Sequence, residues 1–182
     1  MVKKIIKVDG VKIPIGSHEG KTIVFGCDHR GFKYKTEILE FLKQKSYSII
    51  DVGAFSNERC DYPKISDNIG KEVSIDPYNR VGIGICGSGI GILIPASKYP
   101  KVYIARCLNP KEAETSRKHN NTNVLGIGAD LIDLETVLTI IDAWLRTLFY
   151  SDSQTEKPYL NRYIQTIKLE EDIHNSYKQI VS

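Results

Sequence analysis

The chain has 182 residues, which is enough for one domain with a full core, and it is 41% hydrophobic and 26% charged, as ordinary globular proteins are. The formal net charge of +3 is weak, and no dense lysine or arginine cluster argues for a nucleic-acid or membrane partner. No apolar run approaches the roughly 20 residues that span a bilayer, and the N-terminus does not read as a signal peptide. We therefore expect a cytoplasmic protein.

The cysteines predict a reduced protein with free thiols. Cys27, Cys60, Cys86 and Cys107 form no C-x-x-C pair, and a chain of this length does not need disulfide staples. No spacing of histidine, cysteine and acidic residues resembles a metal site, so we expect neither a metal ion nor another cofactor.

The first 20 residues read as an extension that precedes the regular pattern. The segments "KKIIKV" and "VKIPIG" flank Asp9-Gly10, a favourable turn pair, so residues 1–20 form either a short hairpin or a loose arm. Residues 21–182, including a helix at the C-terminus, are expected to form the main domain.

From residue 22 onward, short apolar runs alternate with helical patterns. The predicted strands are residues 22–27, 47–53, 79–86, 101–107 and 122–128. The predicted helices are residues 32–46, 64–74, 111–120, 131–149 and 159–180, with a polar linker over residues 150–158. This order predicts an α/β fold, a three-layer α/β/α sandwich around a five-stranded, parallel, Rossmann-like sheet.

Turn and surface signals support this order. Pro63 suits a helix start, and Asn109-Pro110 caps the helix that follows. Four lysines of the first helix are expected to form a solvated face: Lys33, Lys35, Lys43 and Lys45.

In such sheets, ligands bind beyond the carboxyl ends of the strands. The candidate residues are therefore those that follow each predicted strand: Cys27 to His29, Arg59 to Tyr62, Cys86 to Gly91, Asn109, and Gly128 to Asp130.

One glycine pattern imitates a dinucleotide site. Gly82, Gly84 and Gly87 match G-x-G-x-x-G, but the first two lie inside the predicted strand. No acidic residue follows at the distance that ribose binding requires, so we reject a nicotinamide site.

A second glycine set is better placed. Gly87, Gly89 and Gly91 begin where the strand ends, and their amides, the Ser88 hydroxyl and the start of a following helix can together face a phosphate. The alternative is a plain tight turn, and Pro95 would interrupt the helix.

Four side chains are candidates for chemistry. Cys86 is either a buried small hydrophobe or, near a helix N-terminus, a reactive thiolate. Asp28 and His29 follow the first strand as turn or ligand-binding residues. His119 ends a helix at the edge of the sheet opposite Cys86, so it is either a surface histidine or a residue that reaches the same site from another subunit.

Five ordered motifs resemble a known family. The segments "FGCDHRGFKYK", "ERCDYP", "GICGSGIG", "SRKHNNTNVLGIG" and "IIDAWL" are similar to those of the ribose-5-phosphate isomerase B family, which includes the galactose-6-phosphate isomerase subunits. The resemblance covers roughly residues 22 to 165 and leaves the first 20 outside it. It implies a metal-free interconversion of ribose 5-phosphate and ribulose 5-phosphate, in homodimers that share active sites, with a tetramer as the larger alternative.

The resemblance also implies roles for individual residues. Cys86 would shuttle a proton between C2 and C1, and His119 would open the sugar ring with help from Asp28. The enediolate would be stabilised by the Ser88 hydroxyl and by neighbouring amides: Gly87, Gly89, Ile90 and Gly91. The sugar phosphate would be bound by further side chains: His29, Tyr62, Asn120, Arg162 and Lys157.

Two departures from the family pattern concern the phosphate. Asp130 stands where the family has an arginine, and Pro158 stands where it has the first of two C-terminal arginines. The candidates for the missing cation are Arg30, Lys33 and Lys157. The departures leave two alternatives open: an isomerase of another sugar phosphate, such as galactose or allose 6-phosphate, or a binding module without catalysis.

Overall fold

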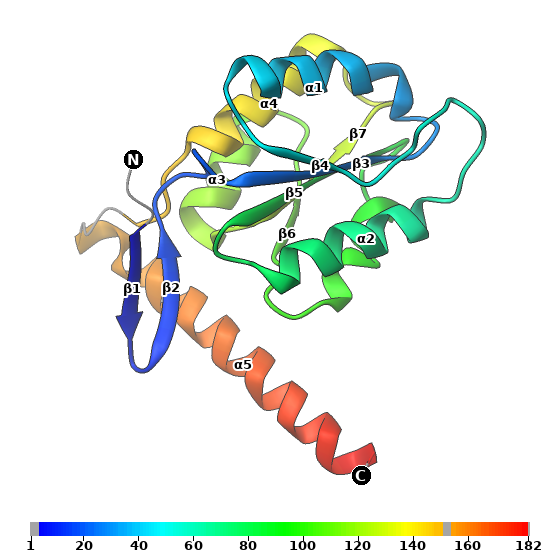
Figure 1. Cartoon of the computed structure of the whole chain (residues 1–182). Coiled ribbons are helices and arrows are strands. Elements are labelled where there is room, and N and C mark those ends of the chain that lie inside the picture. Colours follow the sequence, from blue (N-terminus) through cyan, green and yellow to red (C-terminus); the bar gives the residue numbers. More distant parts are fainter. Residues whose placement is uncertain (1–3, 151–153, 182) are drawn as a thin grey trace.

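The computed structural model describes residues 4–150 and 154–181, and its centre is a parallel sheet (Figure 1). The sheet has five strands in the order β4-β3-β5-β7-β6, all parallel. The predicted strands are all present, although β4 and β6 are shorter than expected. The bounds are β3 (Thr22–Cys27), β4 (Ile49–Asp51), β5 (Arg80–Cys86), β6 (Ile104–Arg106) and β7 (Val124–Gly128).

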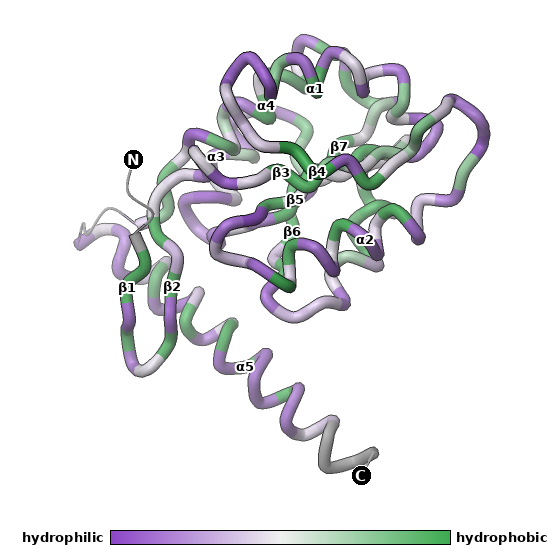
Figure 2. The backbone as a smooth tube through the Cα atoms, in the orientation of Figure 1, coloured by the Kyte–Doolittle hydropathy of each residue, from purple (hydrophilic) through white to green (hydrophobic). Residues whose placement is uncertain are grey.

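Helices cover both faces of the sheet, so the predicted three-layer sandwich is confirmed (Figure 1). The helices are α1 (Lys35–Gln44), α2 (Tyr62–Ile75), α3 (Pro110–Asn120) and α4 (Leu134–Arg146). Alternate strand residues enter two cores, one under α1 and α4 and the other under α2. Trp144 of α4 is completely buried in the first core, and Ile69 of α2 in the second. Figure 2 shows hydrophobic residues concentrated along the central strands.

Side-chain caps fix the starts of two helices. Asn109 accepts a hydrogen bond from the backbone N–H of Glu112 at 2.9 Å, which gives this candidate residue a structural role. Asp133 accepts one from Thr136 at 2.8 Å, so α4 begins three residues later than predicted.

The prediction of a helix after Gly91 is wrong. Two short 3₁₀ turns occupy this segment, Gly91–Leu93 and Ala96–Lys98, and Pro95 stands between them. Proline has no N–H to donate and fixes its own φ, so the apolar pattern does not continue as an α-helix. The segment after Gly91 therefore places no α-helix N-terminus at the glycine loop.

The N-terminal extension is a hairpin rather than a loose arm. Strands β1 (Lys4–Val8) and β2 (Val11–Ile15) pair antiparallel around Asp9 and Gly10, both with positive φ. The hairpin packs on α5 (Lys157–Val181), and the distal half of α5 extends away from the body (Figure 1). Part of the predicted linker, residues 151–153, lies outside the described residues. The shared core of hairpin and helix contains Ile13, Phe149, Leu160, Tyr163, Ile164 and Ile167.

The prediction of a solvated lysine face is wrong for Lys35. Its side chain is 9% exposed, and its Nζ lies 2.7 Å from a carboxylate oxygen of Asp51. The ammonium also lies 4.7 Å from the ring centroid of Phe55, so it connects α1 to the loop after β4. No helix among the described residues is long and apolar enough to cross a membrane.

Candidate active site

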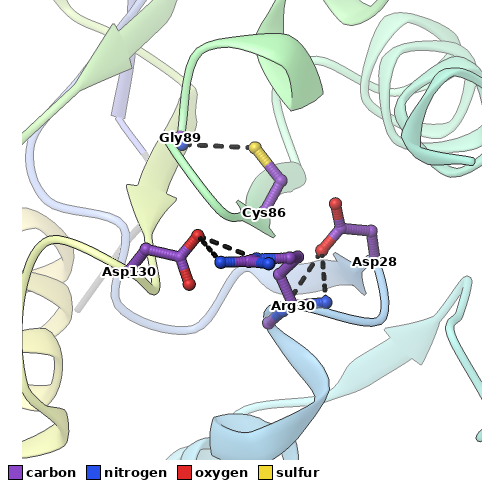
Figure 3. A network of polar contacts seen from close by, with 6 residues as sticks. Asp28, Arg30, Cys86, Gly89 and Asp130 are labelled. Atoms are coloured by element: carbon purple, nitrogen blue, oxygen red, sulfur yellow. Dashed lines mark hydrogen bonds and ion pairs between the residues drawn. The ribbon is translucent and has the colours of Figure 1, made fainter. Parts of the chain in front are cut away.

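The carboxyl ends of β3 and β5 lie side by side at the centre of the sheet, and we call the position between these two strand ends the crevice. From β3 the chain passes to β4 on one side, and it then returns to β5 on the other side. Such a reversal of strand order is where α/β folds bind ligands. The Asp28 N–H donates to the Ile85 carbonyl at 3.0 Å, so Asp28 and Cys86 lie at the same crevice (Figure 3).

The Cys86 sulfur is held in one position. Its Sγ accepts a hydrogen bond from the Gly89 N–H at 3.2 Å (Figure 3), and the residue is 4% exposed. Gly89 has a φ of +73°, and a Cβ there would lie 2.8 Å from the Gly128 nitrogen. Only glycine therefore permits the turn that directs this N–H at the sulfur.

Two other buried thiols, Cys27 and Cys107, lie near the carboxyl edge of the sheet. Burial raises the pKa of Cys27 and of Cys107 to about 11, so these two remain protonated at neutral pH. Cys60 is partly exposed, and all four cysteines are free thiols, as predicted.

The loop after Cys86 carries two exposed residues, Ser88 and Ile90. The Ile90 N–H donates to the Ser88 hydroxyl at 3.2 Å. Tyr62 packs on Gly91, where a Cβ would lie 2.9 Å from Tyr62 Cζ. The Arg106 Nε–H donates to the Ser88 carbonyl at 3.1 Å. Arg106 is not among the residues expected at the site, although its position at the end of a predicted strand could have indicated it.

The turn after β3 is fixed by Asp28. Its Oδ1 accepts hydrogen bonds from the N–H groups of Arg30 at 2.8 Å and Gly31 at 3.1 Å, and the residue is 5% exposed. The next side chain, His29, has its Nδ1 3.1 Å from the Cys60 carbonyl oxygen. Asp28 and His29 therefore belong to the crevice that contains Cys86.

Asp130 pairs with one of the predicted substitute cations. The Arg30 Nε–H donates to Asp130 Oδ2 at 2.8 Å, and Nη2 lies 2.6 Å from the same oxygen (Figure 3). Lys33 has its Nζ over its own neighbour Tyr34, 4.7 Å from the ring centroid.

His119 lies in a second group of candidate residues, at the opposite edge of the sheet. Its ring stacks on Tyr159 with centroids 4.0 Å apart, and Arg162 Cζ lies 5.8 Å from the same Tyr159 ring centroid. His119, Asn120 and Arg162 line a cavity of about 380 Å³. Lys157 is exposed at the start of α5.

Sheet register shows that the two groups are separate within one chain. Cys86 pairs with Gly128 at the carboxyl end of β7, whereas His119 precedes its amino end. Four residue steps along the strand amount to roughly 13 Å. The structure thus brings Cys86, Ser88, Asp28, His29 and Tyr62 together at the carboxyl edge of the sheet. It leaves His119, Asn120, Arg162 and Lys157 apart from them, and for His119 the topology predicts this separation. Among the described residues, no three His, Cys, Asp or Glu side chains are grouped to hold a metal ion.

Comparison with known proteins identifies the class. The chain is a Rossmann-like isomerase, because a family model described as ribose/galactose isomerase matches residues 23–159. The chain belongs to the ribose/galactose isomerase family and is an isomerase.

Relatives within this family are similar over most of their length. The chain is 42% identical over 125 residues to ribose-5-phosphate isomerase B of Escherichia coli K12, covering 69% of this chain and 83% of the relative. The Clostridium thermocellum ribose-5-phosphate isomerase B structure has a TM-score of 0.75 at 34% identity, over 84% of this chain and 99% of that one. The Mycoplasma genitalium enzyme with bound ribulose-5-phosphate also has a TM-score of 0.75, at 27% identity over 82% and 96% of the two chains. The hairpin and most of α5 lie outside the family match.

Proposed function

We propose that this enzyme interconverts ribose 5-phosphate and ribulose 5-phosphate through a cis-enediolate, as a step of pentose phosphate metabolism. The observation that carries the proposal is the Cys86 sulfur, held at the crevice beside Asp28 by the Gly89 N–H at 3.2 Å. The 42% identity to the Escherichia coli enzyme supports the choice of substrate.

In the proposed reaction, Cys86 is the base. Its thiolate takes the proton from C2 of the open-chain aldose, and the electron pair moves onto the C1 oxygen. The cis-enediolate then takes that proton back at C1, while the C2 hydroxyl gives its proton to the C1 oxygen and becomes the ketone. The Ser88 hydroxyl and the amides of the glycine loop stabilise the negative oxygen.

The second group of candidate residues completes the site from another subunit. His119 opens the furanose ring with help from Asp28, Asn120 binds the sugar, and Arg162 and Lys157 contribute positive charge. The separation of the two groups across the sheet supports a homodimer with two shared sites. The larger alternative is a tetramer of two such dimers.

The test compares Cys86→Ala with Cys60→Ala in an isomerase assay on ribose 5-phosphate. Loss of a general base predicts a fall in kcat of about 10²- to 10⁴-fold for Cys86→Ala. Cys60→Ala is the matched control, because Cys60 is a partly exposed thiol whose backbone, not its sulfur, contacts His29. Near-wild-type turnover by Cys86→Ala would show that another group is the base.

Asp130 and Pro158, which depart from the family pattern at the phosphate, are the reason to test two alternative functions in the same assay. Faster turnover of galactose or allose 6-phosphate than of ribose 5-phosphate would identify an isomerase of a six-carbon substrate. Binding of sugar phosphates without turnover of any would identify a binding module.

A further inference from the structure

The side chain of Arg30 lies between Asp28 and Asp130, near the end of the strand that carries Cys86 (Figure 3). It is bonded to Asp130, a residue 100 positions further along the chain, through Nε at 2.8 Å and Nη2 at 2.6 Å. The side chains are 54% and 35% exposed, so the pair is open to solvent.

Both ends of Arg30 are fixed. Its backbone N–H donates to Asp28 Oδ1 at 2.8 Å, and its head group is held by Asp130. The Asp130 N–H in turn donates to the Gly87 carbonyl at 3.1 Å. A guanidinium held in this way loses little conformational freedom when it binds an anion.

Gly87 allows the pair to approach the backbone of the loop. A Cβ at Gly87 would lie 2.6 Å from Asp130 Oδ2 and 3.4 Å from Arg30 Nε. The ion pair thus sits directly on the peptide that follows Cys86, a location that fold stability does not explain, because exposed ion pairs contribute little to folding.

Some N–H groups of the Arg30 guanidinium have no partner among the residues that the structure describes. Asp130 Oδ2 contacts only the edge of the Arg30 guanidinium formed by Nε and Nη2. A guanidinium has five N–H groups, so those on Nη1 and one on Nη2 remain. The remaining N–H groups suit a second anion, and planar, bidentate donation matches phosphate oxygens.

The positions of the sulfur and the guanidinium set the direction of the ligand. Cys86 Sγ is turned towards Gly89, whereas Arg30 lies over Gly87, on the side of Asp130 (Figure 3). A ligand that places its reacting carbons at the sulfur and its anionic end at Arg30 would lie along the crevice. Arg106, the other guanidinium at this loop, has its Nε bonded to the Ser88 carbonyl.

We propose that Arg30, positioned by Asp130, binds the phosphate group of the substrate at the Cys86 end of the site. The proposal rests on the proposed function, since it takes the ligand to be a sugar phosphate. Asp130 is a positioning residue that acts through Arg30.

The experiment uses the full chain and the variants Arg30→Gln, Arg30→Lys and Asp130→Asn. Arg80→Gln is the matched control, because Arg80 also pairs with a carboxylate, that of Glu72, but at the amino end of β5. Calorimetric binding of inorganic phosphate gives a readout independent of turnover. Inhibition by phosphate, KM and kcat for ribose 5-phosphate, and the melting temperature are measured beside it.

Loss of one charged contact predicts that Arg30→Gln weakens phosphate binding and raises KM, each by about ten- to a hundred-fold, with kcat within about threefold of wild type. The phosphate affinity and KM of Arg30→Lys should lie between those of the wild type and Arg30→Gln, because lysine keeps the positive charge but lacks the planar, bidentate guanidinium. Asp130→Asn should weaken phosphate binding by less than Arg30→Gln.

Phosphate binding by Arg30→Gln within about twofold of wild type would overturn the proposal, as would a loss equal to that of Arg80→Gln. A lower melting temperature with unchanged phosphate affinity would also overturn it and leave the pair a structural contact. If the chain does not isomerise ribose 5-phosphate but loses phosphate binding in Arg30→Gln, the proposed function fails while the role of Arg30 stands.

Discussion

The imidazole of His18 is buried against Trp144 and is kept neutral. Its Nε2 lies 3.0 Å from the Thr122 carbonyl, which only accepts, so Nε2 carries the proton. Its Nδ1 is buried and, among the described residues, has no hydrogen-bond partner. Burial, together with the nearby charges of Arg117 and Lys21, holds the pKa of His18 well below its usual value.

This depressed pKa predicts acid sensitivity. Below about pH 6.5 the unfolded chain binds a proton at His18 that the folded chain does not, so the free energy of unfolding falls by up to about 1.4 kcal/mol per pH unit. Urea unfolding between pH 7.5 and 5 measures this slope. His18→Gln, whose amide can still donate to Thr122, should flatten it.

The control for this prediction is His174→Gln, since His174 is exposed on α5. It should leave the wild-type slope unchanged. Equal slopes in the wild type and both variants would mean that another group accounts for the acid sensitivity.

At the scale of elements, the hairpin and α5 stabilise each other. Ile13 of β2 is completely buried against Phe149 and the first turns of α5, whereas Ile5 of β1 is 48% exposed. Arg117 connects α3 to the end of the hairpin, because its Nη2 donates to the carbonyl of Gly16, the residue after β2, at 3.0 Å. The same part of α5 carries Tyr159 and Arg162, which lie beside His119. The hairpin, which the family model does not cover, therefore helps to position the candidate residues around His119.

Ile13→Ala should therefore destabilise the fold by about 2–5 kcal/mol, as truncation of a buried isoleucine does. Ile5→Ala is the matched control in the same hairpin and should change stability by less than about 0.5 kcal/mol. Urea unfolding measures both values, and amide hydrogen exchange in α5 locates the effect. Equal costs for the two variants would show that the hairpin does not stabilise α5.

Predictability differs among the elements for physical reasons. Strands such as residues 22–27 and 79–86 were predicted because each is a short apolar run ended by polar residues or glycine. The segment after Gly91 was predicted wrongly, because apolar spacing resembles a helix even where Pro95 breaks it. Lys35 is buried rather than solvated because it pairs with Asp51 on the following strand. Helix periodicity contains no information about such a tertiary contact.

The candidate site shows the same limit. The position of Cys86, Asp28 and His29 at one crevice followed from strand order alone. The Arg30–Asp130 pair did not, since a contact between residues 100 positions apart depends on how β3 and β7 flank β5. Sequence showed a carboxylate where the family has a cation, and the fold adds the guanidinium that pairs with it.

At the scale of the whole molecule, the proposed active site depends on two groups of candidate residues that one chain holds apart. One chain holds Cys86 and Asp28 at the carboxyl edge of the sheet and His119 at the amino edge, on either side of β7. In a two-fold dimer, each proposed site combines Cys86 of one subunit with His119 of the other, and both sites are equivalent.

This arrangement predicts complementation between two inactive variants. Cys86→Ala and His119→Ala homodimers each carry a defect in both sites, whereas a mixed dimer has one doubly defective site and one intact site. Random exchange at equal concentrations makes half of the dimers mixed, so activity should rise to about a quarter of the wild-type value. The assay follows ribose 5-phosphate turnover after co-expression, or after mixing and reversible dissociation. Each single variant, treated alone in the same way, is the first control. The second control mixes the Cys86→Ala/His119→Ala double variant with wild type, and its activity should not exceed that of wild type diluted to the same concentration. If mixed dimers form without any gain in activity, Cys86 and His119 do not act in a site that two subunits share.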